Sequence, residues 1–172
     1  TKSNGIAIAE KAVSAVLVRR ANDGAAAGES YRPHTSAGTY VHTVIPEAPQ
    51  WRHRTPWLMT NQSQFRPGPP PDLGSEGWAR DYNEVKALGG RRSQQRTAEQ
   101  TEIARFWEEV MPPIYHAIVR SVANSPGRDI TRNARLFAAV TQASDDALIA
   151  VFDAKYHYGF WRPLTAIRNG DI

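Results

Sequence analysis

The sequence predicts an all-α fold class, a helical bundle covered by a long proline-rich ordered wrap. The first observation is that apolar residues recur every three or four positions in several stretches, without convincing strand alternation. The second is that eight of the 12 prolines fall between Pro33 and Pro71, which excludes helix there because each proline removes an amide donor. We interpret residues 1–172 as the N-terminal part of one helical domain, an incomplete half of it.

The first predicted helix covers about residues 5–20, and the sequence 22–24 ends it. One face of this helix is apolar, formed by Ile6, Val13, Val16 and Leu17. The wrap then covers about 21–74 and carries too much apolar surface for a disordered linker, in Trp51, Trp57, Leu58, Met59 and Phe65. Long ordered segments of this kind often shape a functional site.

Four more helices are predicted after the wrap, over about 76–88, 98–110, 113–124 and 130–162. Ser75 caps the first of them, and Gly89 follows its end. Thr97 and Gln100 have the spacing of a capping box at the start of the second. Prolines at 112–113 separate the second helix from the third.

Composition narrows the classes of function. The formal net charge of +4 is a small excess of scattered basic residues, and we expect no nucleic-acid partner. The absence of cysteine excludes disulfides and thiolate ligands, and the five histidines lack metal-ligand spacing. We also expect no transmembrane segment, and no haem, flavin or nucleotide cofactor. The compartment is not predicted.

Two cations stand out in the last predicted helix when its residues are placed at about 100° each. One face is polar, formed by Arg135, Gln142, Asp146, Asp153 and His157, with Asp145 at its margin. The opposite, apolar face holds Phe137, Val140, Ser144, Leu148 and Val151. Lys155 and Arg162 fall on this apolar face, roughly 20° apart. By the same wheel Asp153 faces solvent rather than Lys155.

Two cations without an acid on their own face need an anion, because an unpaired buried charge is costly. The heads of Lys155 and Arg162 can converge on one tetrahedral oxyanion, which accepts from both an ammonium and a guanidinium. Carboxylates of another helix, or exposure of both heads to solvent, are the alternatives. Gly159 leaves room for a ligand near the backbone, and Phe152 is either a pocket wall or a core aromatic.

The segment KYHYGFWRP, from Lys155 to Pro163, resembles the K-x6-R-P signature of the vanadium-dependent haloperoxidases and the type 2 phosphatidic acid phosphatases (PAP2). Phe160-Trp161 and the residues after the proline look more like the haloperoxidases. The wrap, with PEAPQW at 46–51 and SQFRPGPPP at 63–71, looks like their bacterial branch. The resemblance implies that Lys155 and Arg162 bind the equatorial oxygens of vanadate or phosphate.

The resemblance also implies two further motifs, P-S-G-H and S-R-x5-H-x3-D, of which the second carries the axial histidine. Neither occurs in these 172 residues, and no histidine present is in a matching context. His157 is expected at the surface, and His116 is expected to pack or cap. We therefore expect half of an anion site here, with the rest supplied in cis or in trans.

Three functions stay open at this stage. The first is peroxide-dependent halide oxidation with vanadate as cofactor, in which Lys155 and Arg162 are the catalytic residues. The second is a PAP2-type phosphatase in which the same cations hold the phosphoryl group of a phosphoester. The third is an inactive helical module that needs a C-terminal half or a partner, or that forms a homo-oligomer to bury its apolar faces.

Overall fold

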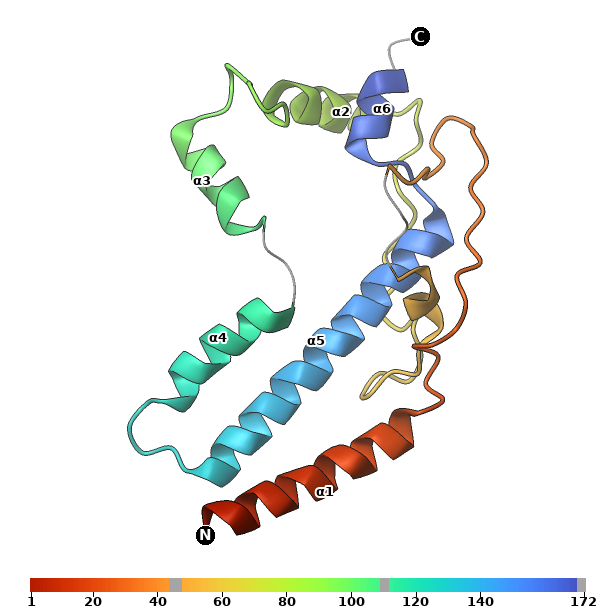
Figure 1. Ribbon diagram of the computed structural model, residues 1–172. Helices are drawn as coiled ribbons and strands as arrows, with labels where there is room; N and C mark the ends of the chain where they lie inside the picture. Colours follow the sequence, from red (N-terminus) through yellow and green to blue (C-terminus); the bar gives the residue numbers. More distant parts are fainter. Residues whose placement is uncertain (44–47, 109–111, 170–172) are drawn as a thin grey trace.

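The chain folds into helices joined by long irregular segments, in a computed structural model that describes residues 1–43, 48–108 and 112–169 (Figure 1). Within these ranges the structure has six α-helices, one short 3-10 helix (η1) and no β-strand, which confirms the predicted all-α class. The elements are α1 Lys2–Arg20, η1 Pro49–His53, α2 Glu76–Leu88, α3 Ala98–Phe106, α4 Pro112–Ala123, α5 Ile130–Tyr158 and α6 Pro163–Asn169. None of these helices in the described ranges has the length and apolarity that a membrane span requires.

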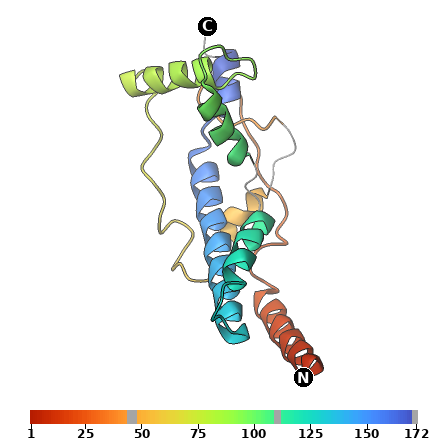
Figure 2. The same ribbon diagram turned by 90° about the vertical axis from the view of Figure 1, so that its left-hand side faces the viewer.

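The long helix α5 is the axis of the molecule. Helix α4 and η1 pack on α5, and α2 packs on α6 just beyond the end of α5. Helices α1 and α6 lie at opposite ends of the molecule (Figures 1 and 2). In the part of the chain that the structure describes, α1 and α3 pack on no other helix, so the arrangement is more open than a closed bundle.

Side-chain caps fix four helix starts in the described residues, at Thr1, Ser75, Thr97 and Asp129. The hydroxyl of Ser75 accepts from the amide of Trp78 and begins α2, whose bounds are those predicted. Thr97 and Gln100 form the predicted capping box of α3. Helix α3 ends at Phe106 and is therefore shorter than the predicted helix, which ended at about residue 110. Residues 109–110 lie outside the described ranges.

The last helix ends earlier than the wheel assumed, and this prediction was wrong. Helix α5 stops at Tyr158, because Gly159 has a φ of 53°, in the left-handed region that ends helices. A separate short helix, α6, then begins at Pro163, in the first-turn position that proline favours. Lys155 and Arg162 therefore do not lie on one continuous helix, and their predicted 20° separation does not apply.

The buried face of α5 is also different from the predicted one. Its buried residues are Asp146, Ile149, Asp153 and Tyr156, so both predicted surface carboxylates are inside, at 4% and 8% exposure. The wrap covers this face and supplies the donors that buried carboxylates need. Val151, expected in the apolar core stripe, is 60% exposed.

The wrap reaches the buried carboxylates with arginine side chains and backbone amides. Arg66 makes a two-pronged ion pair with Asp153, at 2.7 and 2.8 Å. Asp146 accepts from the amides of residues 57–59 at 2.6, 2.8 and 3.0 Å. Apart from η1 the wrap is irregular in the described residues, as its prolines predicted.

The predicted apolar face of α1 contacts no core. No residue of α1 is buried, and Val13 and Leu17 are 57% and 65% exposed. The apolar spacing correctly predicted a helix here, but the apolar face of that helix is exposed.

Candidate functional site

A short backbone pairing brings the wrap to the end of α5. Thr39 and Phe160 form an isolated antiparallel bridge. The amide of Tyr40 donates to the carbonyl of Gly159 at 2.5 Å, and the amide of Trp161 donates to the carbonyl of Gly38 at 2.9 Å. This pairing fixes Tyr40, which is 1% exposed, beside the end of α5.

The ammonium of Lys155 lies among three aromatic rings. Its Nζ is 4.9 Å from the ring centroid of Tyr40, 5.4 Å from that of Phe152 and 5.0 Å from that of Tyr156. A cation within about 6 Å of an aromatic face is attracted by the negative face of the ring. The rings thus hold a charge in a half-buried position without neutralising it.

Arg162 approaches the same tyrosine from the segment between α5 and α6. Its Cζ is 5.6 Å from the ring centroid of Tyr40, and its side chain is exposed. Tyr40 is therefore a common neighbour of the two cations that the sequence singled out.

Neither cation forms an ion pair with a carboxylate of the described residues. Two carboxylates of α5 are paired with arginines of the wrap: buried Asp153 with Arg66, and half-buried Asp145 with Arg54 at 2.9 Å. The alternative in which carboxylates of another helix neutralise Lys155 and Arg162 is thus not seen in these ranges. Both cations keep donors for an external anion.

Of the two predicted pocket residues, Phe152 lies beside the ammonium of Lys155, and Gly159 follows the end of α5. Phe152 stacks on Tyr156 with ring centroids 6.1 Å apart, and it contacts Trp51 of η1 at 5.9 Å. Its ring lines one side of the Lys155 ammonium. A Cβ built on Gly159 meets no heavy atom within 4 Å, so the space beside this glycine is open.

Tyr156 contributes a neutral phenol to this group of rings. Burial, followed by its neighbours Tyr40, Tyr31 and Glu29, raises the pKa of Tyr156 to about 12, although nearby Arg162 acts to lower it. Burial also raises the pKa of Tyr31, whose ring is 5.1 Å from that of Tyr156. At neutral pH these phenols therefore add no negative charge beside the cations.

In the described residues, the histidine side chains make their contacts with residues other than Lys155 and Arg162. His157 is exposed, as expected, and its Nε2 lies 3.5 Å from Arg66. His116 packs edge-on against Phe137 of α5, with ring centroids 6.2 Å apart. In the described residues no three histidine, aspartate or glutamate side chains are grouped so that they could hold a metal ion.

Of the three rings around Lys155, sequence reasoning found Phe152 and missed Tyr40 and Tyr156. Tyr156 follows Lys155 directly in the sequence. The helical wheel was used to locate charged residues, and the aromatic residues beside Lys155 in the sequence were not considered as its contacts. Tyr40 could not be found from spacing, because more than a hundred residues separate it from the end of α5 and only tertiary contacts bring them together.

Comparison with known protein families gives a match to the C-terminal segment. Residues 135–171 match the family model described as the VCPO second helical-bundle domain. Over this segment the chain is similar to a domain of the vanadium haloperoxidases, and the matched segment is less than half of the chain. The match includes Lys155 and Arg162, and it leaves the wrap outside, where we had also expected resemblance. No curated protein and no solved structure matches the chain.

Proposed function

We propose that Lys155 and Arg162 form the cationic side of a vanadate-binding site of the haloperoxidase type, used for peroxide-dependent oxidation of halide. One observation carries the proposal: both cations border the ring of Tyr40, and neither has a carboxylate partner among the described residues. The haloperoxidase match over residues 135–171 supports it.

The residues present fit a tetrahedral oxyanion. A guanidinium and an ammonium supply several N–H donors, and the raised pKa of Tyr156 keeps that neighbouring phenol neutral, so it does not oppose an anion. When bound, vanadate supplies the activation of peroxide towards halide. The motif with the axial histidine that the haloperoxidase resemblance implies does not occur in residues 1–172, so in this proposal these residues supply part of the site.

Each residue has a separate task in this proposal. Arg162 neutralises anionic charge and, being exposed, does so at the entrance of the site. Lys155 donates to an oxygen from a position fixed by the three rings. Tyr40 positions both cations, because its backbone is tied to the end of α5.

The first prediction concerns oxyanion affinity. Titration calorimetry of the chain with vanadate should show binding that Lys155→Ala or Arg162→Ala weakens about 10- to 100-fold, because each change removes charged hydrogen bonds. Arg168→Ala is the matched control, since Arg168 is an exposed cation on the next helix, and it should leave the affinity unchanged. Equal affinity of Arg162→Ala and wild type would contradict the proposal.

Phosphate has the same shape, so the same titration with phosphate and two activity assays separate the reactions. Bromination of a phenol with vanadate and peroxide supports the haloperoxidase function. Release of phosphate from a generic monoester, without bromination, would replace it by the PAP2-type phosphatase.

A further inference from the structure

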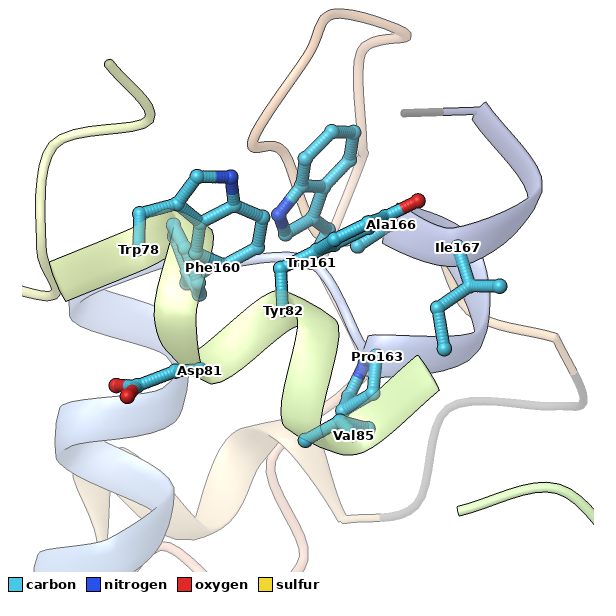
Figure 3. A pocket seen from close by; sticks show the side chains of 9 residues that line it. All are labelled: Trp78, Asp81, Tyr82, Val85, Phe160, Trp161, Pro163, Ala166 and Ile167. Atoms are coloured by element: carbon cyan, nitrogen blue, oxygen red, sulfur yellow. The ribbon is translucent and has the colours of Figure 1, made fainter. Parts of the chain in front are cut away.

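An apolar pocket lies between α2 and the stretch formed by the 160–163 segment and α6 (Figure 3). Helix α2 contributes Trp78, Tyr82 and Val85 to it. The other wall comes from the segment that follows α5 and from α6, with Phe160, Trp161, Pro163, Ala166 and Ile167. Lys155 and Arg162 are not among its lining residues.

The pocket has the size and lining of a site for a small ring. Its volume is about 190 Å³. Apolar cavities of about 150 Å³ hold benzene, so this one has room for one aromatic ring with a small substituent. Trp78 stacks on Trp161 with centroids 5.9 Å apart and meets Phe160 edge-on at 5.5 Å. Such rings offer faces and edges to a further ring.

One polar group of this wall has no partner. The side chain of Trp161 is buried, and its Nε1 has no hydrogen-bond partner in the described part of the chain. A buried donor without an acceptor costs free energy, and a ligand oxygen can recover it. Among the described residues, the only charged one in the lining is Asp81, which is exposed and already paired with Arg80. A negatively charged ligand would therefore gain nothing from this lining.

We propose that this pocket is a binding site for a small uncharged aromatic molecule that carries a hydrogen-bond acceptor. The ring lies against the apolar walls. Nε1 of Trp161 is buried in this structure, so a small turn of the Trp161 ring brings it to the acceptor oxygen, which then accepts from it. This proposal does not depend on the oxyanion site, because it uses none of the same residues.

The test compares anisole with ethylbenzene, which have similar shape and differ in one acceptor oxygen. Titration calorimetry of the full chain should show saturable binding of both in the millimolar range or tighter. Val85→Trp, which places a large side chain in the pocket from a half-exposed helix position, should weaken both at least about 10-fold. Val18→Trp is the matched control, at a 79% exposed position of α1 outside the pocket, and should change neither.

A second variant tests the acceptor. Trp161→Phe keeps an aromatic ring and removes the N–H, so the preference for anisole over ethylbenzene should fall about 2- to 10-fold relative to wild type. The proposal would be overturned if wild type showed no saturable binding of either compound. It would also be overturned if Val85→Trp and Val18→Trp lost the same amount of affinity. An unchanged preference in Trp161→Phe would overturn the role of Nε1. Vanadate titration of Val85→Trp separates the two proposals, because that affinity should stay at the wild-type value.

Discussion

Asp146 illustrates how a carboxylate can be buried when other parts of the chain donate hydrogen bonds to it. Its carboxylate accepts from three consecutive backbone amides of the wrap, those of Trp57, Leu58 and Met59. A buried anion of this kind is stable only because several donors surround it. The same carboxylate without the wrap would be at the surface, which is where the helical wheel put it.

We predict that Asp146→Ala lowers the free energy of unfolding by about 2–4 kcal/mol, because it leaves buried amide donors without an acceptor. Asp146→Asn keeps one acceptor oxygen and should lose less. Urea denaturation at 25 °C measures both. The control is Glu102→Gln, which removes an exposed ion pair with Arg105 and should change stability by less than about 0.5 kcal/mol. A loss below 1 kcal/mol in Asp146→Ala, on the order of ordinary surface changes, would contradict this account.

At the scale of elements, the end of α5 decides the geometry of the candidate site. The left-handed Gly159 ends the helix, and its carbonyl accepts from the amide of Tyr40. The chain then turns into the bridge with Thr39 and enters α6 at Pro163. This turn, rather than helical periodicity, brings Arg162 beside the tyrosine that also contacts Lys155.

We predict that Gly159→Ala destabilises the protein by about 1 kcal/mol, because an L side chain is strained at a φ of 53° although the space around it is open. Thermal or urea unfolding measures the loss. Gly28→Ala is the matched control. Gly28 also has open space beside it but has no left-handed φ, so no loss of stability is expected from this substitution. Equal stability of the two variants would show that the conformation of Gly159 is not constraining.

The molecule as a whole is tied together by contacts between the wrap and α5. Tyr31 and Tyr40 of the wrap form a cluster with Tyr156 of α5, and the hydroxyl of Tyr31 donates to the carbonyl of Tyr40 at 2.5 Å. Arg54 joins Asp23 and Asp145 in a second cluster. Several other faces, including that of α1, stay exposed, and self-association through them remains a prediction.

The tyrosine cluster predicts loss of stability at alkaline pH. The pKa of Tyr156 is about 12 in the folded protein and about 10 when unfolded, so the folded state favours the neutral phenol. Its contribution is complete below pH 10 and is lost as the pH rises towards 12.

Urea denaturation across this pH range measures the loss. Tyr156→Phe, which cannot ionise, should lose less stability between pH 10 and 12 than wild type. Tyr115→Phe, at an exposed position of α4, is the control and should follow wild type. Identical alkaline curves for Tyr156→Phe and wild type would contradict the raised pKa.

The sequence by itself determined the helical class, the bounds of α2, the caps at Thr97 and Ser75, and the two cations that resemble the haloperoxidase signature. These are local properties, because periodicity, capping and proline chemistry act within a few residues. Only the tertiary structure decided which face of α5 is buried, where that helix ends relative to Arg162, and which rings surround Lys155. A helical wheel gives the direction in which each side chain points, but not which residues from other parts of the chain contact it. The wrap brings Arg66, the amides of 57–59 and Tyr40 to α5, and these contacts outweigh the polarity of the face they cover.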